Sequence, residues 1–94
     1  MNAQELTLNI AVNLGRIGRW ALEGRTNRLN QFLQETEGYI LQLEHAPKSS
    51  RFQHTFDAFK QTFDGLKGGV CSDPAWAEMM FTWANILTHR AKLS

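Results

Sequence analysis

The sequence predicts a small all-α protein, and three observations support this prediction. Leu, Ala, Gln, Glu, Arg and Phe recur at spacings of three and four residues, the period of an amphipathic helix. β-Branched residues are sparse and no long stretch alternates apolar with polar residues, so strands are not expected. Breaker residues gather in two clusters, 46–50 and 65–74. We therefore expect one domain, 1–94, folded as a small antiparallel bundle of three to four helices at about 3–23, 26–45, 50–66 and 73–92.

The first 45 residues contain two apolar stripes that do not share one side of a straight helix. The first stripe consists of Leu6, Ile10, Leu14, Ile17 and Ala21, and the second of Leu29, Phe32, Thr36, Tyr39 and Leu43. At 100° per residue the second stripe is rotated by roughly 70° from the first. Gly24 lies at the change of phase and suits a helix end, with Thr26 or Asn27 as the next N-cap. A break here gives a compact bundle, whereas the alternative, one long kinked helix, favours a dimer.

Residues 50–66 are predicted to form a helix that is apolar on one side only. Its apolar residues follow at steps of four and three: Phe52, Phe56, Phe59, Phe63 and Leu66. Ser49 or Ser50 suits the N-cap of this helix, and the glycine-rich segment 65–69 suits its end.

Residues 73–92 are predicted to form the last helix, because the capping residue Asp73 is followed by Pro74. Its apolar stripe consists of Trp76, Met80, Trp83 and Leu87. A row of small residues beside the stripe permits another helix to approach closely: Ala77, Ala84 and Ala91. Each glycine inside a helix costs about 1 kcal/mol relative to alanine. We therefore expect Gly15 and Gly18 to face this small row, with a kink as the alternative.

Charge and cysteine content exclude several classes of protein. The formal net charge of +1 provides no strong field toward nucleic acid, an anionic membrane or an acidic partner. The single cysteine, Cys71, excludes an internal disulfide framework and is typical of a reducing compartment. The N-terminal residues do not resemble a signal peptide, and no apolar run approaches the roughly 20 residues of a membrane span. We expect a cytoplasmic protein with no membrane contact.

Candidate catalytic and metal-binding groups do not converge in the sequence. Of the three histidines, only His54 has a carboxylate at helical spacing, Asp57, and a metal site needs three or four ligands. Cys71 has no base that the sequence can place beside it. We expect no enzymatic activity, cofactor or metal, and a ligand- or metal-binding bundle is kept as a second alternative.

Four arginines form the one basic cluster in the sequence and suggest nucleic-acid contacts as an alternative function: Arg16, Arg19, Arg25 and Arg28. A recognition surface concentrates positive charge on one side. Glu23 shares a helix face with the first two arginines, and further acidic residues follow soon after. The pattern therefore favours a solvated face with local ion pairs over a nucleic-acid-binding regulator.

The strongest functional signal is a surplus of apolar residues. Leu8, Val12 and Trp20 fall outside the main stripe of the first helix, and Phe81 stands opposite the last helix's stripe. Such residues can join a patch that binds a partner, unless the bundle buries the first helix on two sides. We therefore predict a non-enzymatic helical protein–protein interaction module, a small adaptor or regulator that self-associates as a homodimer.

Overall fold

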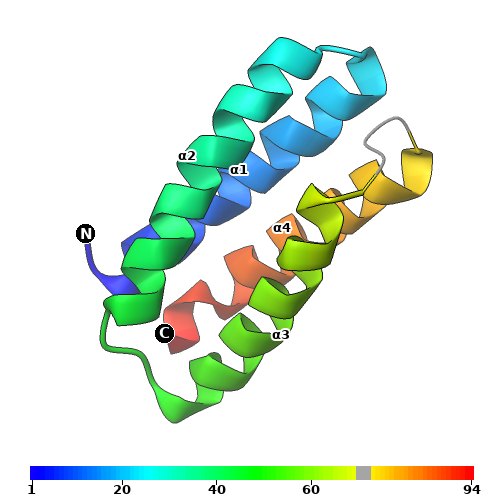
Figure 1. The fold of residues 1–94 in the computed structure, drawn as a ribbon. Helices are drawn as coiled ribbons and strands as arrows, with labels where there is room; N and C mark the ends of the chain where they lie inside the picture. Colours follow the sequence, from blue (N-terminus) through cyan, green and yellow to red (C-terminus); the bar gives the residue numbers. More distant parts are fainter. Residues whose placement is uncertain (70–72) are drawn as a thin grey trace.

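The computed structural model describes residues 1–69 and 73–94, and these residues form four α-helices without any strand (Figure 1). The helices are α1 (Ala3–Glu23), α2 (Thr26–His45), α3 (Ser50–Lys67) and α4 (Pro74–Arg90), and a short 3-10 helix, η1 (Ala91–Leu93), follows α4. The all-α prediction is confirmed. The predicted helix bounds differ from the observed ones by at most two residues.

Consecutive helices run in opposite directions, and the two chain ends lie at the same end of the bundle (Figure 1). α1 packs closely against α2 and against α4, whereas the backbone of α3 approaches α4 and η1 at few positions. The bundle has a Cα radius of gyration of 12.5 Å. α1 is thus covered on two sides and has a third side without a neighbouring helix.

The connection between α1 and α2 is a tight turn at Gly24, so the alternative of one long kinked helix is wrong. Gly24 has φ 73°, a left-handed conformation that glycine adopts without steric cost. The N–H of Arg25 donates to the carbonyl oxygen of Trp20 at 2.9 Å and closes α1. The predicted caps Thr26 and Asn27 are also wrong: Arg25 is the N-cap and makes no side-chain cap hydrogen bond. The first turn of α2 is exposed, so water can satisfy its free N–H groups.

The predicted caps of α3 and α4 are confirmed. The Ser49 hydroxyl accepts a hydrogen bond from the N–H of Phe52 at 3.2 Å, and an Asp73 carboxylate oxygen accepts one from Ala75 at 3.0 Å. Pro74 occupies the first turn of α4, where its missing N–H costs nothing. The predicted loop residue Cys71 lies outside the described residues.

Hydrogen bonds tie the loop between α2 and α3 both to the end of α2 and to the residues that follow α4. The Lys48 ammonium group donates to the carbonyl oxygens of Leu43, Glu44 and Ala46 at 2.6, 2.9 and 3.0 Å, which satisfies the free end of α2. The Ser49 hydroxyl also donates to the carbonyl oxygen of Leu93, and the Ser49 N–H donates to that of Ser94 at 3.3 Å. The start of α3 is therefore tied to the segment that follows α4.

The core consists mainly of the predicted apolar stripes. Its largest fully buried side chains are Leu6, Ile10, Leu14, Ile17, Leu29, Leu43, Phe52, Phe56, Phe59, Met80 and Leu87. Each contributes roughly 1.5–3 kcal/mol of transfer free energy relative to an exposed side chain. Trp83, predicted as part of the α4 stripe, is half-buried.

The prediction that the two glycines of α1 face the alanine row of α4 is wrong. A Cβ at Gly18 would lie 2.8 Å from Cε1 of Phe81, so Gly18 makes room for an aromatic ring instead of the alanine row. A Cβ at Gly15 would meet no atom within 4 Å. Ala77 and Ala91 are nevertheless buried, as expected where α1 and α4 lie close together.

Candidate functional site

An exposed apolar stripe runs along the side of α1 that no helix covers. Leu8, Val12 and Leu22 expose 38%, 52% and 61% of their surface. With Gly15 they follow at steps of four, three and seven residues, which places them within an arc of roughly 80° at 100° per residue. We call these four residues, Leu8, Val12, Gly15 and Leu22, the α1 surface.

Phe81 extends the α1 surface onto α4. Its ring lies against Gly18, one turn from Gly15 on α1, and 37% of the residue is exposed. The structure therefore places three of the predicted partner-binding residues, Leu8, Val12 and Phe81, along one side of the bundle. Leu22 was not predicted, although its spacing of fourteen residues from Leu8 places it on the same side of the helix.

Trp20, the fourth predicted partner-binding residue, lies away from the α1 surface. It is half-buried between α1 and α2, where its ring and that of Phe32 have centroids 4.8 Å apart. The guanidinium carbon of Arg28 lies 6.0 Å from the Trp20 ring centre. Trp20 thus belongs to the α1–α2 interface and does not join Leu8 and Val12 in one patch.

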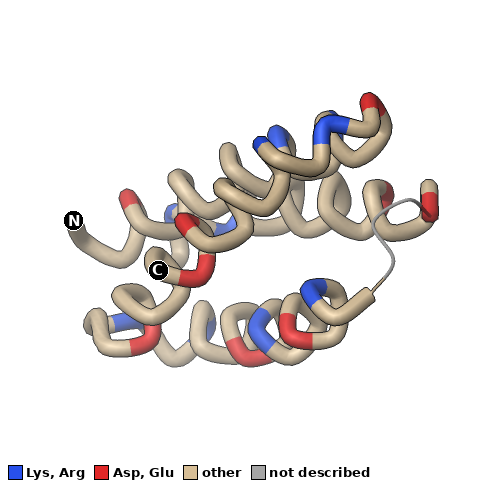
Figure 2. The backbone as a smooth tube through the Cα atoms, turned by 45° about the horizontal axis from the view of Figure 1, so that its top comes forward, with Lys and Arg blue, Asp and Glu red and all other residues tan. Residues whose placement is uncertain are grey.

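The four arginines of the basic cluster have different surroundings. Arg16 lies over the ring of Phe32 at 5.8 Å, close to Trp20 and Arg28, whereas Arg25 pairs with Glu23 at 3.4 Å. Arg19 is exposed and, four residues after Gly15, falls within the arc of the α1 surface, between Val12 and Leu22 along the helix. Figure 2 shows basic and acidic positions interspersed along the helices. The local ion pairs expected from the sequence are thus present at Arg25.

Charged groups on the exposed side of α2 and α3 pair with one another. Lys60 donates to Glu44, which lowers the pKa of Glu44 below its ordinary value and raises that of Lys60. The Tyr39 hydroxyl donates to Glu35 at 3.1 Å, and this hydrogen bond raises the Tyr39 pKa. These contacts join side chains at the surface, and Glu44 and Lys60 also line a small pocket of about 190 Å³ between α2 and α3.

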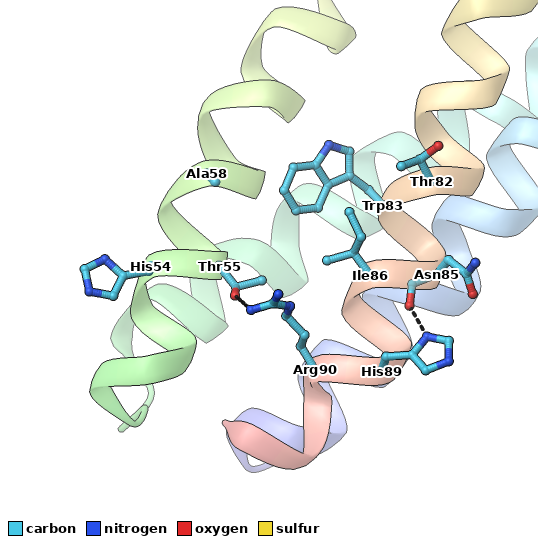
Figure 3. A pocket seen from close by; sticks show the side chains of 9 residues that line it. All are labelled: His54, Thr55, Ala58, Thr82, Trp83, Asn85, Ile86, His89 and Arg90. Atoms are coloured by element: carbon cyan, nitrogen blue, oxygen red, sulfur yellow. Dashed lines mark hydrogen bonds between the residues drawn. The ribbon is translucent and has the colours of Figure 1, made fainter.

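A groove of about 670 Å³ separates α3 from α4, and sequence reasoning did not find it (Figure 3). It is lined by His54, Thr55 and Ala58 of α3 and by Thr82, Trp83, Asn85, Ile86, His89 and Arg90 of α4. A guanidinium nitrogen of Arg90 donates to the Thr55 hydroxyl at 3.2 Å and links the two helices. The one sequence signal is that Trp83 and Ile86 lie at the edge of the α4 stripe, where a core helix borders solvent.

The histidines do not assemble a metal site in the described part of the chain. No group of three or more His, Cys, Asp or Glu side chains there could hold a metal ion. Asp57, the expected partner of His54, instead accepts a hydrogen bond from Gln53 at 2.8 Å. His54 and His89 lie at opposite rims of the groove (Figure 3).

None of the helices formed by 1–69 and 73–94 combines the length and apolar character needed to cross a membrane.

Comparison with protein-family models, with curated proteins and with solved structures finds no match to this chain. The function is therefore inferred from the surfaces of the molecule.

Proposed function

We propose that this protein is a non-enzymatic helical interaction module, a small adaptor or regulator, that self-associates through the α1 surface. The observation that supports this proposal is the position of Gly15. It lies at the centre of an exposed apolar stripe, and a Cβ there would meet no atom of its own chain within 4 Å. A glycine inside a helix costs about 1 kcal/mol relative to alanine. Gly38 of α2 and Gly65 of α3 are equally open, so the exposed apolar residues around Gly15, and not the glycine alone, distinguish this position.

A helix of a second chain can contact this position. Glycine has no side chain, so the backbone of another helix can approach closely at Gly15 while flanking apolar residues are buried. Leu8 and Val12 lie on one side of Gly15 along the helix, and Leu22 lies on the other. Phe81 borders this surface from α4 and adds aromatic area, a residue type enriched at interfaces.

The spacing of the α1 surface favours a second copy of this chain as the partner. In a two-fold dimer each residue meets its counterpart or a reciprocal partner. Leu8 and Leu22 each stand seven residues from Gly15. If two α1 helices cross in antiparallel orientation at Gly15, Leu8 of each copy comes opposite Leu22 of the other. The net charge of +1 per chain opposes this association only weakly.

The oligomeric state of the Gly15→Gln variant tests the proposal. We expect the wild-type chain to form dimers at micromolar concentration in analytical ultracentrifugation. Gly15→Gln should weaken the dimer by about tenfold or more, because the added side chain holds the helices apart. Circular dichroism should show an intact fold, since the position has free space.

Gly38→Gln on α2 is the matched control. A Cβ at Gly38 also meets no atom within 4 Å, but this position lies outside the α1 surface, so the dimer should persist. A wild-type chain that stays monomeric at about millimolar concentration would refute self-association, as would a Gly15→Gln variant that dimerises as well as the wild type.

A second candidate function, a nucleic-acid-binding regulator, is favoured by one observation. Arg16 and Arg28 lie beside the rings of Phe32 and Trp20, and arginine next to aromatic rings is a common arrangement in single-strand binding. This function predicts that a fluorescent single-stranded oligonucleotide binds at low salt, that the affinity falls steeply as salt rises, and that Arg28→Met weakens it. Unchanged fluorescence anisotropy at low salt would eliminate this candidate.

A further inference from the structure

The groove between α3 and α4 combines an apolar floor with positive charge. Trp83 and Ile86 are half-buried in the middle of the groove, and Arg90 lies at one end of it (Figure 3). No acidic side chain contributes to its lining. The groove therefore differs from the exposed side of α2 and α3, where Lys60 and Lys67 are neutralised by the carboxylates of Glu44 and Glu37.

The groove is a consequence of aromatic packing. Phe59 lies between α3 and α4, and its ring centroid is 5.5 Å from that of Trp83. Phenylalanine side chains of this size keep the α3 backbone away from α4 along most of its length. On the groove side of α3 the small side chains of Ala58 and Thr55 lie nearest Trp83 and Ile86, and His54 points away from them (Figure 3), so space remains above Trp83 and Ile86.

Arg90 is held in position but retains free hydrogen-bond donors. One guanidinium nitrogen donates to the Thr55 hydroxyl at 3.2 Å, and Thr55 is buried. A guanidinium group carries five N–H donors, and Arg90 forms no ion pair with any described residue. Arg90 is thus an exposed cation at the end of the groove, with one neutral contact and no ion pair to a described residue.

We propose that this groove binds a small organic acid: a carboxylate group attached to an apolar alkyl or aromatic body. The carboxylate binds the free N–H groups of Arg90, whose planar fork suits two parallel hydrogen bonds. The apolar body lies over Trp83 and Ile86, and the polar side chains of Thr82 and Asn85 border it. The volume of about 670 Å³ is within the range of roughly 300–1,000 Å³ that is typical of small-molecule sites.

Charge and size select this ligand class over a metal ion or a partner helix. A metal ion would need ligands that converge, whereas His54 and His89 occupy opposite rims (Figure 3). A partner helix would need a longer trough, and the Arg90–Thr55 bridge closes this groove at one end. Arg90 is exposed, so a neutral apolar molecule would leave its charge to water, whereas a carboxylate would gain a charge-assisted hydrogen bond there.

An NMR titration with three defined probes tests the proposal. Octanoate and 2-naphthoate carry the carboxylate on an alkyl and an aromatic body, and octanol is the neutral control. We expect at least one acid to shift the indole N–H signal of Trp83 and the methyl signals of Ile86 in a saturable manner. The two acids distinguish an alkyl from an aromatic ligand, and octanol should bind about tenfold more weakly than octanoate.

Two variants locate the binding site, and a third is the matched control. Arg90→Met keeps the length of the side chain but removes its charge, and should weaken binding of the acid about tenfold or more. Ala58→Leu fills the groove from an exposed position and should reduce binding without loss of stability. Arg28→Met removes an arginine on α2 and should leave binding unchanged. The proposal is overturned if neither acid binds, if octanol binds as well as octanoate, or if Arg90→Met binds the acids like the wild type.

Discussion

The two sides of α4 show how side-chain size decides the distance between helices. On one side α4 lies close to α1, where buried Ala77 and Ala91 and the bare backbone of Gly18 leave no space. On the other side α4 faces α3 across Phe59 and Trp83, and the backbones stay apart. Interaxial distance depends on the side chains at the contact, so the small-residue side is filled and the aromatic side leaves a groove.

One small bundle thus presents two different kinds of surface. At the close α1–α4 contact the helices leave little space, and the outer side of α1 carries the exposed apolar residues, with Arg19 among them, that we propose to bind a second copy. The wide α3–α4 contact creates a concave site that suits a small molecule.

Removal of the aromatic spacer should have the largest effect. Phe59→Ala should lower the free energy of unfolding by about 3–5 kcal/mol, because the 1%-exposed ring leaves a cavity between α3 and α4. Phe81→Ala on the other side of α4 should cost roughly half as much or less, since Phe81 is partly exposed. Urea unfolding measures both, and equal losses would contradict the assignment of Phe59 as the spacer.

A larger side chain at the close α1–α4 contact should have the next largest effect on stability. Ala77→Leu should destabilise the protein by about 1–3 kcal/mol, because the buried side of α4 has no room for the added atoms. The same change on the wide side, Ala58→Leu, should alter stability by less than about 0.5 kcal/mol. Thermal unfolding of the two variants checks this pair, and the contrast fails if both are tolerated equally.

The attachment of α3 at its first residues should contribute a smaller amount. Ser49→Ala removes the cap of α3 and the hydrogen bond to Leu93, and should cost about 1–2 kcal/mol. Ser50→Ala is the control, since the exposed Ser50 has no side-chain hydrogen bond to a described residue. Chemical denaturation should rank the two variants in this order, and a neutral Ser49→Ala would show that α3 is held by its phenylalanines alone.

Substitution by alanine should change stability differently at the two glycines of α1. Gly15→Ala should stabilise the isolated monomer by about 0.5–1 kcal/mol, because alanine is the better helix former and the position is open. Gly18→Ala should gain less, since its Cβ forces the Phe81 ring to move. Unfolding at dilute concentration compares them, and an equal gain would place Phe81 away from Gly18 in solution.

The pH dependence of the Glu44–Lys60 pair should be the smallest effect. The pKa of Glu44 is lowered in the folded state, so its contribution is present above the ordinary glutamate range, about 4.3, and is lost as pH falls through the folded value. The pKa of Lys60 is raised, so its contribution is lost only as pH rises through the folded value. A small urea-midpoint difference between the wild type and Glu44→Gln at about pH 7 should vanish at about pH 3. A difference that persists in acid would exclude the ion pair as its cause.

Local chemistry made the helices predictable from the sequence. Gly24 marks the end of α1, Ser49 the start of α3 and Pro74 the first turn of α4, because each residue acts on its own neighbours in the chain. The Thr26 cap failed because the left-handed Gly24 reverses the chain within two residues and makes Arg25 the N-cap.

The candidate sites could be predicted only in part, because they depend on which helix covers which side. Leu8 and Val12 were identified because they lie outside an apolar stripe, but the same criterion selected Trp20, which α2 half-buries. The Arg90–Thr55 hydrogen bond joins residues 35 positions apart, and no local pattern encodes such a pair. The groove itself depends on the volume of side chains from two helices.

The loop that carries Lys48 and Ser49 should couple the local unfolding of two distant parts of the chain, the start of α3 and η1. Ser49 holds the residues that follow α4, and Lys48 closes the last turn of α2. Amides near the start of α3 and amides of η1 should therefore exchange with deuterium through one shared opening event, at similar rates. Because Thr55 lies near the start of α3 and accepts a hydrogen bond from Arg90, the same opening should also break this link at one end of the α3–α4 groove.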